Sequence, residues 1–409
     1  MRLAWLTVAL LWPVALLNYL DRQMLASMKT SITGDIPDIA SEANWGWILA
    51  QITWTYAILS PFGGYFADRF SRRWTICGSL FAWSAITWAT GHVASFQGLL
   101  WTRTLMGISE AFYIPAALAL ITEYHLGATR SRAVGIHQTA IYCGIILGGF
   151  AGYAADAPAI GWRVTFDVTG ILGILYAFPL LWLLREPPRS PRADVATSTI
   201  SPWTALSNLL RNRSFLLLVA YFTLPAAAGW VMKDWMPALL KEWFKLGQGM
   251  AGVSAALYIN VASLAGAYFG GWWADRWMSR SSRGRIYASA AGMFLMVPAL
   301  LGIGVAPTLL AAIGFLALFG MGWGIFDCNN MPILAQIAPA RLRATGYGLM
   351  NLVSISFGGL VDWQFGYLRD QEVPSNLIFA GFALSALISI VLVLLIRPRS
   401  ASELELSNN

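Results

Sequence analysis

Four ionisable residues lie in stretches of sequence that are otherwise apolar. Asp21 and Arg22 stand together in "LLNYLDRQML", residues 16–25, while Arg103 and Glu110 stand seven residues apart in "RTLMGISE". Ionised side chains within membrane hydrocarbon cost about 3 kcal/mol each on insertion scales, so they face a polar cavity or one another and commonly bind ions, protons or substrate. These residues therefore predict a site for an anion and a proton.

Helix geometry limits how these four residues can pair. Neighbouring helical residues point about 100° apart, so Asp21 and Arg22 cannot satisfy each other well. Arg103 and Glu110 share a helix face but lie about 10 Å apart along the axis, too far to pair directly. We expect Asp21 to pair with Arg103, Arg22 to hold a substrate anion, and Glu110, with Asp21, to carry the coupling proton, because desolvation favours a neutral carboxyl group. The alternative is a purely structural network of buried ion pairs.

Composition places these residues in a membrane. The chain has 409 residues, of which 57% are hydrophobic and 11% are charged, whereas soluble domains average about 25% charged residues. Strand-like alternation of polar and apolar residues is absent, and helices satisfy their own backbone polar groups in lipid. The sequence predicts an all-α integral membrane protein.

Twelve spans can be placed, since a span needs about 20 apolar residues. Their predicted limits are 3–28, 45–67, 74–93, 97–122, 133–155, 162–184, 214–236, 248–274, 286–305, 309–338, 344–368 and 375–396. A linker rich in Pro, Ser and Arg, residues 185–213, separates six spans from six. We predict a six-helix bundle over 1–184, a cytoplasmic linker with a short surface helix in "SPWTALSNLLRNRSF", and a second six-helix bundle with a short tail over 214–409.

Basic residues set the predicted orientation. Most of the 27 Lys and Arg residues fall on one side of the twelve spans, the side that holds both termini. The positive-inside rule makes that side the cytoplasm. We expect a multi-pass protein of a cell membrane of the bacterial inner-membrane type. The net charge of +7 then reflects topology and does not indicate a nucleic-acid partner.

The two halves repeat each other. The segment "GGYFADRFSRR", residues 63–73, matches "GGWWADRWMSR", residues 270–280, and "GISEAFYIPAALA", residues 107–119, matches "GIFDCNNMPILAQ", residues 324–336. A third match, "RAVG" at 132–135 with "RATG" at 343–346, follows in the same order. The second match aligns Glu110 with Asp327 and Pro115 with Pro332. Parallel six-helix repeats with a binding site between them are a standard transporter design.

These motifs resemble a known family. "GGYFADRFSRR" resembles the loop signature of the major facilitator superfamily, and the weaker copy at 270–280 stands where that superfamily has it. "NYLDR" with "RTLMGISEAFYIPA" resembles the anion:cation symporters, which move sugar acids and other organic anions. The spinster-type lipid transporters share closely similar elements. The resemblance implies that the matching Asp and Glu couple protons and that the matching Arg binds a substrate carboxylate.

The superfamily resemblance also implies a cytoplasmic latch. A loop carboxylate can sit at the positive N-terminal end of a neighbouring helix. The matching residues are Asp68, Arg69 and Arg73 in the first half, and Asp275 and Arg276 in the second. The alternative is a basic loop that only sets the topology.

Further polar residues in the spans are candidate substrate contacts, although aromatic ones also pack. They are Tyr19, Tyr56, Arg103, His137, Gln138, Asn330 and Asn351. Lys233 is a gate or substrate contact, or else it snorkels to the interface. Asp327 departs from the neutral residues common in that half of the family, and is either a second proton site or a helix–helix partner.

The sequence favours a transporter over an enzyme. It contains no phosphate-binding glycine loop, no metal-ligand grouping of histidines and no Ser-His-Asp arrangement, so we expect no catalytic residues, cofactor or metal. We predict proton-coupled symport of a small organic anion by alternating access, with a sugar acid such as a hexuronate, an aldonate or a sialic acid as substrate. The alternative is a spinster-like transporter of amphiphiles or lysolipids. We expect a monomer in the lipid bilayer, with sodium as the alternative coupling ion.

Overall fold

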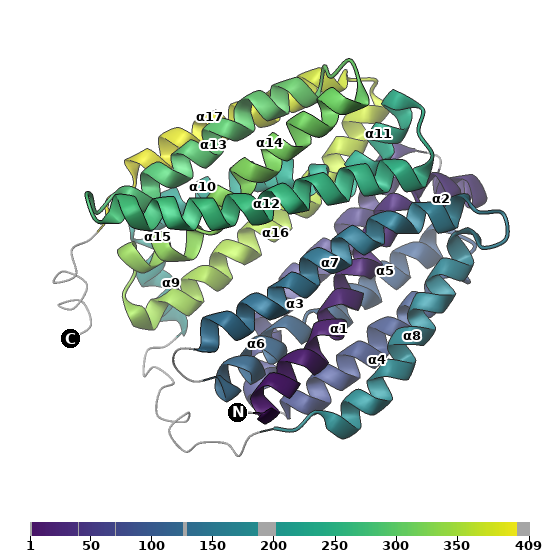
Figure 1. Cartoon of the computed structure of the whole chain (residues 1–409), viewed down its shortest axis with the longest axis horizontal. Helices are drawn as coiled ribbons and strands as arrows, with labels where there is room; N and C mark the ends of the chain where they lie inside the picture. Colours follow the sequence, from purple (N-terminus) through teal and green to yellow (C-terminus); the bar gives the residue numbers. More distant parts are fainter. Residues whose placement is uncertain (1, 40, 70, 126–128, 187–201, 399–409) are drawn as a thin grey trace. The chain divides into compact units, whose positions relative to one another are not determined.

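The computed structural model describes residues 2–39, 41–69, 71–125, 129–186 and 202–398, and every regular element in these ranges is a helix (Figure 1). Nine stretches within them are long and apolar enough to cross a membrane. They are α1 (Arg2–Ser27), α5 with α6 (Phe96–Glu110 and Tyr113–Tyr124), α7 (Arg130–Asp156), α8 (Gly161–Leu183), α10 (Arg213–Asp234), α12 (Gln248–Met278), α13 (Gly284–Ile303), α14 with α15 (Leu309–Asp327 and Asn330–Ile337) and α17 (Ser375–Leu395).

The remaining three predicted spans are also helical, although they are less apolar. They are α3 (Glu42–Arg69), α4 (Arg72–Thr90) and α16 (Ala340–Asp370). Short helices join some of these: α2 (Lys29–Asp35), the 3₁₀ turn η1 (Pro37–Ile39), α9 (Pro202–Leu210) and α11 (Met236–Phe244). Each of the twelve predicted spans thus coincides with one long helix or a helix pair. Helix α9 confirms the short helix predicted in the linker, whose residues 187–201 lie outside the described ranges.

Two spans are interrupted at equivalent positions of the repeat. Helix α5 ends at Glu110 before α6 begins, and α14 ends at Asp327 before α15 begins. Pro115 and Pro332 stand five residues after these acids, and proline has no amide hydrogen to donate to the carbonyl four residues earlier. The backbone therefore breaks directly after the acidic residue in both halves.

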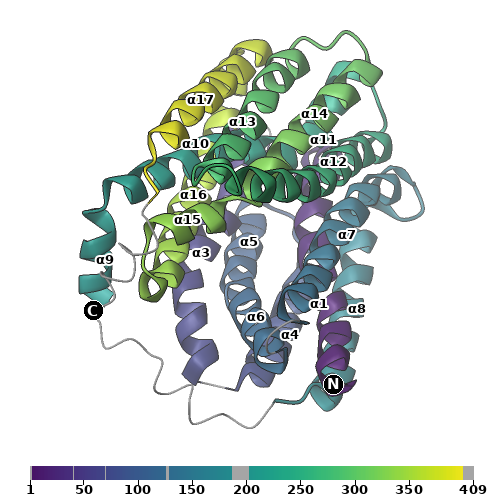
Figure 2. The same cartoon turned by 60° about the vertical axis from the view of Figure 1, so that its left-hand side comes forward.

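The chain divides into two compact units, each of which is made of three separate segments of the chain. The first comprises Met1–Pro188, Val231–Leu257 and Gly359–Gln371, and the second comprises Arg189–Trp230, Tyr258–Gly358 and Glu372–Asn409. In the first, α1 lies along α7 and α4 lies along α8 (Figure 1). In the second, α13 packs against both α14 and α17 (Figure 2). The predicted bundles over 1–184 and 214–409 stay a prediction from the sequence repeat.

Glycine allows α7 to approach α1 closely. A Cβ atom on Gly144 would lie 2.3 Å from the carbonyl oxygen of Leu16, and one on Gly148 would lie 2.8 Å from that of Leu20. Small residues commonly permit such contacts between membrane helices. The glycines of α7 therefore fix the position of α1, the helix that carries Asp21 and Arg22.

Candidate functional site

Arg22 and Glu110 form a buried ion pair. The Arg22 Nε donates a hydrogen bond of 2.6 Å to Glu110 Oε2, and a second guanidinium nitrogen of Arg22 contacts the same oxygen. The Glu110 side chain is fully buried, whereas that of Arg22 retains 11% exposure. Glu110 is the last residue of α5, so the carboxylate is presented where the span is interrupted.

The predicted pairing of Asp21 with Arg103 is wrong. Asp21 Oδ2 accepts a hydrogen bond of 2.8 Å from the Thr87 hydroxyl. Arg103 Nη2 donates one of 2.6 Å to the Thr90 hydroxyl and is fully buried. Among the described residues, no ion pair within 4.0 Å joins Asp21 to Arg103, although each remains within electrostatic range of the other.

Helix α4 explains the difference. Thr87 and Thr90 are three residues apart, so both hydroxyls point from one face of α4, and both residues are fully buried. Thr87 binds Asp21 and Thr90 binds Arg103, the two residues that the sequence predicts to pair with each other. Thr87 and Thr90 were not predicted as site residues. The sequence feature that could have indicated them is the spacing of the two threonines in "TWAT" at 87–90.

Two of the predicted aromatic residues flank Arg22. The guanidinium carbon of Arg22 lies 4.8 Å from the ring centroid of Tyr56 and 5.7 Å from that of Tyr19. Both distances allow a cation–π interaction, which favours a cation that is partly withdrawn from water. The structure thus brings together Arg22, Glu110, Tyr19 and Tyr56.

His137 and Gln138 have different surroundings. His137 is buried in α7, with its Nε2 atom 3.0 Å from the hydroxyl of Tyr113. That hydroxyl also donates to the carbonyl oxygen of Leu11 at 3.1 Å. Gln138 is exposed. His137 therefore sits in a contact between helices, and its role in substrate binding stays a prediction.

The candidates of the second half lie in the second compact unit. Asn330 is buried beside Asp327 at the break between α14 and α15, and Asp327 is exposed. Asn351 is half-buried in α16. Their contacts with substrate stay predictions.

The residues of the predicted latch are described only in part. The side chains of Asp68 and Arg69 lie outside the described set. Arg73 Nε donates to the carbonyl oxygen of Leu181 at 2.8 Å, near the C-terminal end of α8, where the last four carbonyl groups have no partner within the helix. In the second copy, Asp275 Oδ1 lies 3.5 Å from Arg285 Nη2, and Arg276 is exposed. The gating role stays a prediction.

Lys233 belongs to a polar group at the end of α10. Its Nζ atom lies 3.7 Å from Asp234 Oδ1. Its carbonyl oxygen accepts a hydrogen bond of 3.3 Å from Gln23 Nε2. Pro237 cannot donate to that carbonyl, which leaves it open to the side chain from α1.

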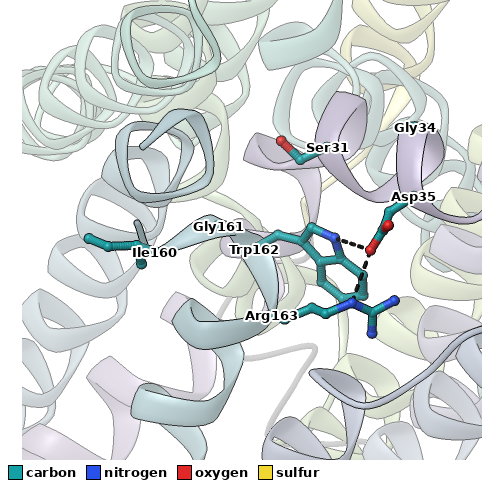
Figure 3. A pocket seen from close by; sticks show the side chains of 7 residues that line it. All are labelled: Ser31, Gly34, Asp35, Ile160, Gly161, Trp162 and Arg163. Atoms are coloured by element: carbon teal, nitrogen blue, oxygen red, sulfur yellow. Dashed lines mark hydrogen bonds and ion pairs between the residues drawn. The ribbon is translucent and has the colours of Figure 1, made fainter. Parts of the chain in front are cut away.

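A surface pocket lies elsewhere in the first unit, between α2 and the start of α8 (Figure 3). Its lining residues are Ser31, Gly34, Asp35, Ile160, Gly161, Trp162 and Arg163. The Asp35 carboxylate accepts hydrogen bonds from Arg163 Nε at 2.9 Å and Trp162 Nε1 at 3.2 Å. The opposite charges of this pocket already satisfy each other, and it contains none of the predicted site residues.

Comparison with known proteins places this geometry in a family. The chain is 33% identical over 255 residues to protein spinster homolog 1 of Homo sapiens, a match that covers 59% of this chain and 47% of that protein. It is 27% identical over 372 residues to protein spinster of Drosophila melanogaster, covering 87% and 60%. An MFS-type efflux pump of Mycolicibacterium smegmatis is 27% identical, with 90% and 85% covered. The chain spans about half the length of the curated spinster relatives it matches.

The fold has a solved counterpart. The crystal structure of a bacterial homolog of the human lysosomal transporter spinster matches with a TM-score of 0.77 at 20% identity, covering 96% of this chain and 95% of that one. The two chains therefore share one fold. The model of the Major Facilitator Superfamily matches residues 11–361, and with most of its length matched the chain belongs to that superfamily.

Proposed function

We propose that this transporter couples proton movement to the transport of an organic anion by exchange of partners at Arg22. The Arg22–Glu110 ion pair carries the proposal, because Glu110 is fully buried and its Oε1 atom has no hydrogen-bond partner among the described residues. A proton on Glu110 removes the counter-charge of Arg22. A substrate carboxylate or phosphate then takes its place on the guanidinium.

The charge balance of the site favours symport. Asp21 and Glu110 carry two negative charges, and Arg22 and Arg103 carry two positive charges. An added substrate anion leaves one negative charge in a buried site, which is costly, and one proton restores neutrality. Proton and anion therefore strengthen each other's binding, as reciprocal linkage requires. Asp21 lies within electrostatic range of Glu110 and is the second coupling acid.

Two substrate classes fit an anion anchored at Arg22. The spinster-type relatives and the aromatic faces of Tyr19 and Tyr56 beside Arg22 favour an amphiphilic anion with an acidic head group. The hydroxyls of the same tyrosines can hydrogen-bond to a sugar acid, the other candidate. We place the amphiphilic anion first.

Uptake into proteoliposomes tests this function. The substrates are a hexuronate, an aldonate, a sialic acid, a lysophospholipid and a neutral hexose, each with and without an imposed pH gradient, and with a sodium gradient as a separate arm. We expect only acidic compounds to be transported, and the pH gradient to increase their uptake several-fold. The proposal would be refuted if only the neutral hexose were transported. It would also be refuted if the pH gradient had no effect on the uptake of any anion.

A further inference from the structure

A second pair of acidic residues is buried in the first compact unit. Asp234 ends α10 and Asp362 lies in the last third of α16; they are 6% and 0% exposed. Their carboxyl groups are within hydrogen-bonding reach of each other. Neither oxygen of Asp362 makes a well-formed hydrogen bond to a described residue. Asp234 is the partner of the candidate residue Lys233, but neither acid takes part in the Arg22–Glu110 ion pair.

The backbone around this pair is held in place by close contacts. A Cβ atom on Gly46 of α3 would lie 2.5 Å from the carbonyl oxygen of Asp362, so only glycine allows α3 to approach α16 here. On the other side, Gln23 of α1 binds the carbonyl oxygen of Lys233. Close contacts thus hold the backbone beside each acid, at Asp362 through α3 and next to Asp234 through α1.

Two cationic groups among the described residues act directly on the pair. Lys233 Nζ lies 3.7 Å from Asp234, and Arg22 of α1 is within electrostatic range of the same carboxyl group. The indole nitrogen of Trp235 faces Asp362 and is buried. Lys29 lies over the Trp235 ring but is paired with Glu42 of α3.

We propose that Asp234 and Asp362 form a second proton-binding site, in which the two carboxyl groups share one proton. Two buried carboxylates in contact cannot both stay ionised, so such pairs titrate as a unit. One shared proton leaves a single negative charge, which Lys233 balances. Release of the proton to water leaves two adjacent carboxylates, and their repulsion weakens the contact between the end of α10 and α16.

The second site is linked to the first through Arg22. This guanidinium forms an ion pair with Glu110 and also attracts the Asp234 carboxylate electrostatically. A proton on Glu110 strengthens the attraction of Arg22 for Asp234 and so favours release of the shared proton. This linkage rests on the proposed function, whereas the shared proton itself does not.

Infrared spectroscopy of the protein in phosphatidylethanolamine–phosphatidylglycerol nanodiscs tests the shared proton. The C=O stretch of protonated carboxyl groups is recorded as the pH is raised, for the wild type, Asp234→Asn, Asp362→Asn and the double variant. Either single substitution leaves one carboxylate beside one ammonium group, which need no proton. We expect each single variant to lose the signal of one carboxylic acid, and the double variant to lose no more.

Two results would overturn the proposal. An unchanged signal in both single variants would mean that both acids are ionised, and a double variant that loses two acids would mean that each holds its own proton. Asp362→Glu keeps the carboxyl group and should retain the signal, which separates a lost proton from a misfolded variant. Asp35→Asn removes an exposed carboxylate and serves as the matched control, while Glu110→Gln reports on the proposed transport site separately.

Discussion

At the scale of single residues, Arg22 interacts with both acidic and aromatic side chains. It forms an ion pair with Glu110, lies against two tyrosine rings and is within electrostatic range of Asp234. Arginine remains charged in proteins and offers five donors in a planar fork. We therefore expect the protonation of its neighbours, and not its own, to decide whether it holds Glu110 or a substrate anion. Two predictions concern this residue and its partner.

Replacement of Arg22 alone should destabilise the protein strongly. Arg22→Met leaves the fully buried Glu110 carboxylate unpaired, and breaking a buried pair from one side costs about 3–5 kcal/mol. We expect a clear fall in the midpoint of thermal unfolding in detergent. Arg22→Met/Glu110→Met removes both charges and should recover most of the loss. A double variant as unstable as the single one would show that the ion pair is not the cause.

Replacement of Glu110 should separate transport from proton coupling. Glu110→Gln keeps the size of the side chain but cannot exchange a proton. We expect uptake to lose its several-fold stimulation by a pH gradient, while substrate exchange without a gradient persists, because Arg22 still binds the anion. Asp35→Asn, which removes an exposed carboxylate paired with Arg163 outside the site, is the control and should keep the stimulation. Full stimulation of uptake in Glu110→Gln would show that another residue carries the coupling proton.

At the scale of helices, the site depends on interrupted spans and on close helix contacts. The breaks after Glu110 and Asp327 carry the same proline five residues later, and Gly144 brings α7 against α1. Both features follow from residues that lack a group, an amide hydrogen in one case and a Cβ atom in the other. Each can be tested by restoring the missing group.

A methyl group on Gly144 should disturb the contact between α7 and α1. The Cβ atom of Gly144→Ala would collide with the Leu16 backbone at 2.3 Å, and overpacking costs about 1–3 kcal/mol. Gly135→Ala is the control in the same helix, since nothing lies within 4 Å of its Cβ position. We expect a lower unfolding midpoint only for Gly144→Ala. Equal effects of the two substitutions would contradict this packing.

Restoring the amide at position 115 should slow transport. Pro115→Ala allows a hydrogen bond to the carbonyl of Ala111 and favours a continuous helix through the break. We expect the uptake rate to fall several-fold with no loss of thermal stability. Pro179→Ala, in the uninterrupted helix α8, should leave the rate unchanged. A wild-type rate in Pro115→Ala would show that the break has no role in the transport cycle.

At the scale of the whole molecule, the basic residues predict the orientation. The twelve predicted spans would put both termini on one membrane side, and the excess of Lys and Arg there predicts that this side is the cytoplasm. We expect a C-terminal green fluorescent protein fusion to fluoresce in bacterial cells, and a C-terminal alkaline phosphatase fusion to be inactive. A phosphatase fused after Asp38, in the segment between the first two spans, should be active. The opposite pattern would invert the orientation.

The number and place of the spans were accessible from the sequence, because burial in lipid leaves a signal in every stretch of about 20 apolar residues. The repeat was accessible as well, since Glu110 and Asp327 stand in matching motifs. The superfamily assignment confirmed the fold that these motifs implied. The transport roles of the individual residues stay predictions.

Which charges meet was decided only by the tertiary structure. Sequence position gives the height of a residue along its helix, but not the rotation of that helix or the reach of a long side chain. Arg22 therefore pairs with Glu110. Asp21 and Arg103, which were predicted to pair with each other, bind the hydroxyls of Thr87 and Thr90 instead. Asp234 and Asp362 lie 128 residues apart in the chain but face each other in the structure, where Gly46 lets α3 approach α16 closely at Asp362. Pairwise contacts between distant helices depend on packing that no single stretch of sequence encodes.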